Sequence, residues 1–158
     1  MLEDNTIRTF RGGEISYEDF LLKVMKLNDE GLDVYIGTDS QVVKDRISIV
    51  TSICLYKRGI PKNQIFYVKK KLKKKRHPTL RSRMLLEAHS SLEAALELDP
   101  AVDGTLTVHL DIGTDIRKSK SAKLSKELRI IFEAQGFGCE LKPNSWASSC
   151  VADRYTKS

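Results

Sequence analysis

The pattern of apolar positions predicts four helices along this chain. The first is expected over about residues 16–30, because Ser16 and Asp19 form a capping-box pattern and Gly31 is a natural stop. Its apolar side chains recur at helical spacing, which predicts one buried face. The remaining helices are expected over residues 80–98, over about 121–135, and after Ser145, which is read as the cap of the last one.

Five short runs rich in apolar and β-branched residues predict strands between these helices. They cover residues 33–37, 46–56, 64–70, 106–110 and 139–142. The first three follow one another across short turns, as in an antiparallel meander, and the later ones alternate with helices. The order β-β-β-α-β-α-β-α predicts an α/β fold, with a mixed five-stranded sheet flanked by helices and an extra N-terminal helix. Residues 1–158 are expected to form one domain with a core over about 31–157, because no linker or repeat interrupts the pattern.

Four acidic residues occur at expected strand ends or on helices expected to lie against the sheet: Asp39, Glu87, Asp111 and Asp153. Asp111 directly follows the fourth strand, so it stands at a carboxyl end, where open α/β sheets place their ligands. If the first and fourth strands are neighbours, Asp39 ends beside Asp111. Carboxylates that converge raise each other's pKa unless divalent cations lie between them. Two Mg²⁺ or Mn²⁺ ions would suit such a set, because hard oxygen ligands favour these metals over zinc.

Each of these acids also has an ordinary structural interpretation. The Thr-Asp-Ser sequence around Asp39 is good turn chemistry. Asp153 could form a salt bridge with Arg154 or a nearby lysine. A lone glutamate on a helix, such as Glu87, is usually solvated. The four acids taken together carry the metal-site hypothesis, which none of them carries alone.

Glu87 is distinguished from the other acids of its helix by its position around the helix axis. The stripe expected to be buried consists of Leu85, Ala88, Leu92, Ala95 and Leu96. At 100° per residue, Glu93 and Glu97 fall on the side away from this stripe, as on a solvated face. Glu87 falls on the opposite flank, and it is therefore the candidate ligand on this helix.

Basic residues concentrate in one stretch of the chain. Residues 69–83 contain nine Lys or Arg and no acid, although the whole chain has a net charge of only +6. Such lysines would neutralise phosphates without reading sequence, while a solvated loop is the ordinary alternative. Trp146 could stack on a base, with half-buried packing as its alternative. The residues expected to contact nucleic acid are Ser40, Lys70, Lys71, Lys73, Lys74, Lys75, Arg76, Arg83, Lys142 and Trp146.

Several features argue against other classes of protein. Three cysteines without metal-type spacing indicate free thiols in a reducing compartment rather than a disulfide framework or a zinc site. The apolar windows are too short to cross a membrane, and the N-terminus lacks the pattern of a secretory signal. No histidine and aspartate stand at a spacing that supports a serine nucleophile, and His109 is expected to be structural. We therefore expect a cytoplasmic protein that does not bind membranes.

The order of elements, with acids on the first strand, the next helix, the fourth strand and the last helix, resembles the ribonuclease H-like superfamily. The phrases IGTDSQ, HLDIGT and KPNSWASSCVADRYTK resemble more specifically the bacterial YkuK-like family, which has no settled activity. The resemblance covers nearly the whole chain after about Gly31. It implies metal-binding and catalytic roles for Asp39, Glu87, Asp111 and Asp153. The first-strand motif departs from the Asp-Gly pair common in true ribonucleases H, which leaves the substrate open.

These observations predict a metal-dependent nuclease that hydrolyses RNA, RNA/DNA hybrid or structured DNA with two Mg²⁺ or Mn²⁺ ions. A module of the same fold that binds nucleic acid without cutting it is the main alternative, and an enzyme acting on a small phosphorylated substrate is the third. The set of acids favours the enzyme, because a pure binder gains nothing from carboxylates that repel phosphate. The basic stretch favours a polymer over a small substrate.

Overall fold

The computed structural model describes residues 1–112 and 122–157. A mixed seven-stranded sheet forms its centre, in the order β2-β1-β5-β4-β3-β6-β7. The strands are β1 (Ile7–Thr9), β2 (Glu14–Ile15), β3 (Asp33–Val43), β4 (Arg46–Tyr56), β5 (Gln64–Lys73), β6 (Leu106–His109) and β7 (Gly138–Glu140). The helices are α1 (Tyr17–Asp29), α2 (Leu80–Leu98), α3 (Ala122–Ala134) and α4 (Asp153–Thr156), with short 3₁₀ helices η1 (Lys74–Arg76) and η2 (Asp99–Ala101) and a π-helix, η3 (Ala147–Ala152).

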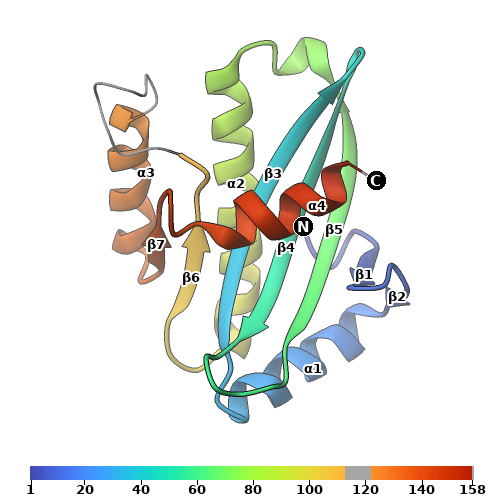
Figure 1. Ribbon diagram of the computed structural model, residues 1–158, viewed down its shortest axis with the longest axis vertical. Helices are drawn as coiled ribbons and strands as arrows, with labels where there is room; N and C mark the ends of the chain where they lie inside the picture. Colours follow the sequence, from blue (N-terminus) through green and yellow to red (C-terminus); the bar gives the residue numbers. More distant parts are fainter. Residues whose placement is uncertain (113–121, 158) are drawn as a thin grey trace.

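Helices cover both faces of the sheet. α2 lies behind it in Figure 1, and α4 crosses in front. Buried side chains of α1, α2 and α3 join one large core with the sheet. A second, smaller core lies beneath the C-terminal helix and contains Val50, Tyr67, Ala152 and Tyr155. The two faces are called here the α2 face and the α4 face.

The five predicted strands are all present, and the structure adds two that the sequence pattern did not show. β1 and β2 form a small antiparallel hairpin that extends the sheet beyond β5. Strands of three and two residues are too short to display an alternating pattern. β3 is also longer than expected, because its polar second half remains paired with β4 as far as Val43. Asp39 therefore lies inside a strand, and the turn interpretation of this residue is wrong.

The helix boundaries agree with the sequence pattern better than the helix faces do. Ser16 Oγ accepts a hydrogen bond of 3.1 Å from Asp19 N and caps α1, as expected. On α2 the expected buried stripe is confirmed at Ala88 and Ala95 and is wrong at Leu85 and Leu96, which are exposed. The side chains that α2 buries are Ala88, Ser91, Ala94, Ala95 and Leu98.

Two expectations about polar residues on the helices are also wrong. Glu97 is not solvated: its carboxylate accepts hydrogen bonds from the backbone N–H groups of Leu2 and Glu3, at 2.7 and 2.9 Å. Ser145 does not cap the last helix through its side chain, whose Oγ has no partner among the described residues. The C-terminal helix begins instead as the π-helix η3, and the expected start of α3 at residue 121 lies outside the described residues.

The strand register brings the expected acids to one end of β6. β6 runs parallel to β3 and pairs with Val34–Gly37. Beyond Gly37, β3 continues without a strand partner on that side among residues 1–112 and 122–157. Asp111 follows β6 by two residues, so it lies beside this open edge of β3. The expected adjacency of the first and fourth strands is therefore confirmed.

Two further expectations concern thiols and membranes. Cys54 and Cys139 are buried free cysteines. Burial raises the pKa of the Cys54 thiol to about 12, so this thiol stays protonated at neutral pH. Among the described residues, no helix is both long enough and apolar enough to cross a membrane.

Candidate functional site

The middle of β3 presents polar side chains to both faces of the sheet. Successive residues of a strand point to opposite faces. Thr38 Oγ1 lies 2.7 Å from Ser91 Oγ of α2, which places Thr38 on the α2 face. Asp39 Oδ2 accepts a hydrogen bond of 3.3 Å from Thr156 Oγ1 of α4, which places Asp39 on the α4 face. The candidate acids therefore approach β3 from two sides.

Glu87 reaches β3 from the α2 face. Its Oε1 accepts two hydrogen bonds from Ser40, one of 3.1 Å from the backbone N–H and one of 2.6 Å from the hydroxyl. Burial raises the pKa of Glu87 to about 7, and the charges of Asp39 and Asp111 contribute in the same direction, while the bonds from Ser40 oppose the shift. Glu87 therefore lies close enough to Asp39 and Asp111 for their charges to raise its pKa.

Asp39 and Asp153 form a carboxylate pair on the α4 face. Asp39 is 8% exposed, and burial raises its pKa to about 6, with the charge of Asp153 as the second cause. The pKa of Asp153 is lowered, chiefly by a hydrogen bond of 2.9 Å from Lys157 Nζ. Gln41 Nε2 donates to the other Asp153 oxygen at 3.2 Å. The predicted salt bridge of Asp153 to a lysine is thus present, in addition to its place beside Asp39.

Asp111 has an oxygen whose hydrogen-bonding capacity is unused. Lys142 Nζ lies 3.2 Å from Asp111 Oδ1 and forms an ion pair with it. The ammonium does not have hydrogen-bond geometry there, and this buried oxygen has no hydrogen-bond partner among the described residues. The ion pair offsets the lost hydration of this oxygen only in part, because the oxygen still lacks a hydrogen bond. Such an oxygen is available to a cation.

The start of the C-terminal helix is fastened closely to the sheet. A Cβ atom on Gly37 would overlap the backbone of Ala147 and Ser148, so glycine is required for this approach. Ser52 Oγ donates to Ala147 O at 2.8 Å, and His109 Nδ1 accepts from Ala147 N at 3.0 Å. Burial lowers the pKa of His109 to about 4, which keeps it neutral and able to accept this bond. The structural role expected for His109 is confirmed, and these contacts fix where Asp153 and Thr156 meet Asp39.

The donor chemistry of the four acids fits a hard divalent cation. Carboxylate oxygens are the preferred ligands of Mg²⁺ and Mn²⁺, and Asp111 offers an oxygen without a hydrogen bond. Within residues 1–112 and 122–157, however, no group of three or more metal-ligating side chains is assembled. Each acid instead has a partner within the protein: Ser40 for Glu87, Thr156 for Asp39, Lys142 for Asp111 and Lys157 for Asp153.

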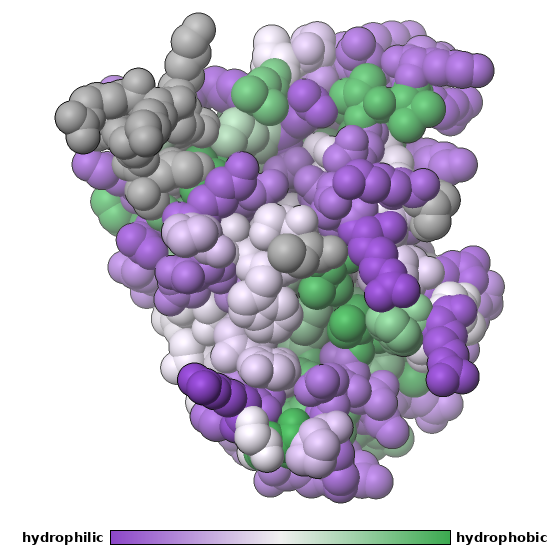
Figure 2. All heavy atoms as spheres, in the orientation of Figure 1, coloured by the Kyte–Doolittle hydropathy of each residue, from purple (hydrophilic) through white to green (hydrophobic). Residues whose placement is uncertain are grey.

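The lysines of the basic stretch are divided between the two faces of the sheet. Lys71 and Lys73 share the α4 face with Lys69, whereas Lys70 shares the α2 face with Ser40. The remaining predicted residues follow the strand: Lys74, Lys75 and Arg76 in η1, and Arg83 on α2. Figure 2 shows hydrophilic residues along the upper right of the molecule, over the ends of β3, β4 and β5, around a smaller hydrophobic patch.

Trp146 packs among aromatic rings at the start of the C-terminal helix. Its ring centroid lies 4.9 Å from those of Tyr35 and His109, and 5.8 Å from that of Tyr56. The side chain is half-buried, in agreement with the packing interpretation. Base stacking by Trp146 and a phosphate contact by Lys142 stay predictions.

A hollow on the α4 face contains basic residues that sequence reasoning did not select. Lys44, Arg46, Lys69 and Lys157 line it together with Lys71. The alternation of residues along β5 is the feature that identifies the lysines of this strand. Once the pairing of β5 with β4 is known, Lys69 and Lys71 are seen to share one face of the sheet. The sequence pattern ends the third strand at residue 70 and therefore assigns Lys71 to no face of the sheet.

Comparison with known proteins gives two matches. The model of a family described as "Ribonuclease H-like" matches residues 17–157. The chain is similar to a protein named "Uncharacterized protein YkuK" from Bacillus subtilis (strain 168), with 30% identity over 138 residues, which cover 77% of each chain. No solved structure matches the chain.

Proposed function

Because this chain belongs to the ribonuclease H-like family, we propose that it is a metal-dependent nuclease that hydrolyses phosphodiester bonds of RNA, RNA/DNA hybrid or structured DNA in the cytoplasm. The observation that carries the proposal is the position of four acids around the open edge of β3 beyond the end of β6. Asp39 and Glu87 lie there with pKa values of about 6 and 7, raised chiefly by burial and further by neighbouring carboxylates. Burying Asp39 and Glu87 within the influence of other carboxylates has a cost that packing alone does not require.

Divalent ions bound by Asp39, Glu87, Asp111 and Asp153 would activate a water molecule and stabilise the leaving oxygen of a phosphodiester. The residues around the acids prepare them for this role. Ser40 holds Glu87 through two hydrogen bonds, and Thr156 orients Asp39. Lys142 and Lys157 neutralise Asp111 and Asp153, which lowers the repulsion among the four carboxylates.

Cleavage by wild type and by Asp111→Asn tests the proposal. End-labelled RNA, DNA, hybrid and four-way-junction substrates are incubated with Mg²⁺ or Mn²⁺, and we expect Asp111→Asn to lower the cleavage rate at least about a hundredfold. Asp33→Asn is the matched control: it removes an exposed acid at the opposite end of β3, where Asp33 pairs with Lys57. Equal rates in wild type and Asp111→Asn would contradict the proposal.

A second function, nucleic-acid binding without cleavage, is favoured by one specific observation. Each candidate acid already has a hydrogen-bond or ion-pair partner in the protein, and no three acids are grouped as metal ligands among the described residues. Binding of these substrates without cleavage in either metal would support this function and overturn the nuclease.

A further inference from the structure

The hollow on the α4 face has a volume of about 620 Å³ and lies directly beside the Asp39–Asp153 pair. Three of its lining residues hydrogen-bond these two carboxylates: Gln41 and Lys157 donate to Asp153, and Thr156 donates to Asp39. The lining contains five cations and one acid: Lys44, Arg46, Lys69, Lys71, Lys157 and Asp45. The hollow is therefore a cationic surface that adjoins the candidate acids.

The hairpin register arranges this surface in rows across the sheet. Residues paired directly in antiparallel strands point to the same face. Asp39 is in a row with Lys69 on β5, and the next row toward the hairpin end contains Gln41, Ser48 and Lys71. Two strand residues span about 7 Å, which is close to the spacing of successive phosphates along an extended nucleic-acid strand. The lysines of β5 thus lie in the row of Asp39 itself and in the row about 7 Å farther along the strands.

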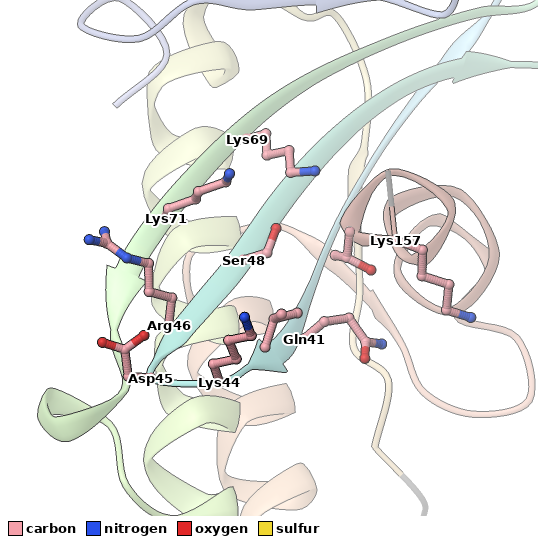
Figure 3. Close-up of a pocket in the computed structure, with 10 residues that line it drawn as sticks. Gln41, Lys44, Asp45, Arg46, Ser48, Lys69, Lys71 and Lys157 are labelled. Atoms are coloured by element: carbon pink, nitrogen blue, oxygen red, sulfur yellow. The ribbon is translucent and has the colours of Figure 1, made fainter.

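Ser48 is the residue of this hollow that most directly indicates a ligand. It is 8% exposed, and its Oγ has no hydrogen-bond partner among the described residues. Figure 3 shows Ser48 on β4, between the lysines of β5 (Lys69 and Lys71) on one side and Gln41 on the other. A buried hydroxyl without a hydrogen-bond partner is unfavourable. An acceptor bound in the hollow would provide the hydrogen bond that Ser48 Oγ lacks.

The charges in the hollow favour an anionic acceptor. Lys44 and Lys71 form no hydrogen bond or ion pair within residues 1–112 and 122–157. Lys69 donates to Tyr155 O at 3.0 Å, and its pKa is lowered by burial and by the charge of Lys71. An anion between these lysines would relieve their repulsion. Among the described residues, no aromatic side chain lines the hollow for stacking on a base, so its chemistry suits a backbone phosphate rather than a nucleobase.

We propose that this hollow binds the phosphodiester backbone of a nucleic-acid strand, with one phosphate accepting a hydrogen bond from Ser48 Oγ and its neighbours held by Lys44 and Lys71. The strand then continues along the α4 face toward Asp39 and Asp153. The identity of the anion as nucleic acid rests on the proposed function. The location of the site rests on the strand register, on the unpartnered hydroxyl of Ser48 and on the cations that line the hollow.

The experiment is anisotropy of a labelled single-stranded RNA, titrated with protein in EDTA over a series of salt concentrations. The variant Lys44→Gln/Lys71→Gln should weaken binding about tenfold and lower the salt slope by about 1.4, since each lost phosphate contact removes about 0.7. The matched control is Lys23→Gln/Lys26→Gln, which removes two exposed lysines of α1 and should change affinity less than about twofold. Equal affinities for the two double variants would overturn the proposal.

Ser48→Ala separates a ligand contact from a structural role. A hydroxyl that stabilises the fold would lower the melting temperature when removed. An unpartnered hydroxyl that serves a phosphate should leave it unchanged or raise it, while RNA affinity falls about threefold to tenfold. Wild-type affinity in Ser48→Ala would overturn the assignment of this residue.

Inorganic phosphate distinguishes a strand site from a site for a free anion. Phosphate should compete with RNA no better than chloride at equal ionic strength. Specific displacement by millimolar phosphate, with unchanged RNA binding in Lys44→Gln/Lys71→Gln, would overturn the strand site.

Because these titrations contain no divalent cation, they test the hollow independently of cleavage. If the hollow variants lose RNA while Asp111→Asn still cleaves like wild type, the proposed function fails and the hollow stands. If Asp111→Asn is inactive while the hollow variants bind RNA normally, the proposed function stands and the proposal for the hollow fails. Failure of the wild type to bind RNA in EDTA would overturn the hollow in either case.

Discussion

On the α2 face of β3, Glu87 is held by two hydrogen bonds from Ser40, whereas on the α4 face Asp39 has one hydroxyl partner and a second carboxylate beside it. The surroundings differ as well. Thr38 and Ser91 form a buried hydroxyl pair near Glu87, while the α4 face opens into the hollow lined by lysines. The cations of the hollow therefore adjoin Asp39 on the α4 face, whereas α2 covers the other face.

The comparison indicates that the two faces of the sheet have different roles. The α2 face keeps one carboxylate in a fixed position beside small buried side chains, which allow the helix to pack closely on the sheet. The proposed substrate would approach along the α4 face, and the contacts of Gly37, Ser52 and His109 with the C-terminal helix determine the shape of this face. Changes to these contacts should affect Asp39 and Asp153 without directly disturbing Glu87.

The largest expected effect comes from Gly37→Ala. The added Cβ would overlap backbone atoms of Ala147 and Ser148, and backbone yields less readily than the end of a flexible side chain. We expect the free energy of unfolding, measured by urea denaturation, to fall by about 3 kcal/mol. Gly13→Ala is the control, because a Cβ there meets only Thr9 Oγ1 at 3.5 Å. Equal stability of the two variants would show that η3 does not depend on this close approach.

A smaller effect is expected from acidification, through His109. Its pKa is about 4 in the folded chain against an ordinary value of 6.5, so the unfolded chain binds the proton first as the pH falls. The stability contributed by neutral His109 is present above about pH 6.5 and is lost as the pH falls toward 4, by about 2 kcal/mol.

His109→Asn tests this contribution, because asparagine keeps an acceptor for Ala147 N and does not titrate. Unfolding measured between pH 7 and pH 4 should be less sensitive to acid in the variant than in the wild type. Parallel pH profiles would show that His109 is not kept neutral by its burial beneath the C-terminal helix.

A still smaller effect of opposite sign is expected from Asp39→Asn. The pKa of Asp39 is raised to about 6, so the folded chain binds the proton more tightly than the unfolded chain, and the ionised carboxylate destabilises the fold above that pH. The variant should gain about 1 kcal/mol at pH 8, allowing for partial hydration, and this gain should fade as the pH falls toward 4. Thermal unfolding at both pH values measures it. A loss of stability at pH 8 would indicate that Asp39 is a structural anchor of α4.

The strands and helices were predictable because their signals are local. Apolar runs and the Ser16 cap predict the order of the elements. The expected pairing of the strand that contains Asp39 (β3) with the strand before Asp111 (β6) places these two acids side by side. The face of α2 was not predictable from its leucines, because close packing on the sheet selects small residues such as Ala88 and Ser91 for the buried side. Polar residues from Thr38 to Gln41 likewise concealed the second half of β3, which pairing with β4 maintains.

The division of the candidate site between two faces required the register. The sequence shows a run of lysines, but only the pairing of β5 with β4 separates Lys69 and Lys71 from Lys70. Lys157 and Ser48 lie far from that run in the sequence and reach the hollow through tertiary structure. The ion pair between Lys142 and Asp111 is equally non-local, since it joins the end of β6 to the loop after β7.

The smallest expected effect concerns Lys44, at the turn between β3 and β4. Its φ of 57° lies in the left-handed region, which costs a residue with a side chain more than glycine. Lys44→Gly should therefore raise the free energy of unfolding by about 0.5 kcal/mol, measured by urea denaturation, even though it weakens RNA binding at the hollow. Lys44→Gln removes the same charge without changing the backbone preference, so it should weaken binding equally at unchanged stability. A lysine retained in an unfavourable conformation is expected where its charge serves a ligand, and a loss of stability in Lys44→Gly would contradict that explanation.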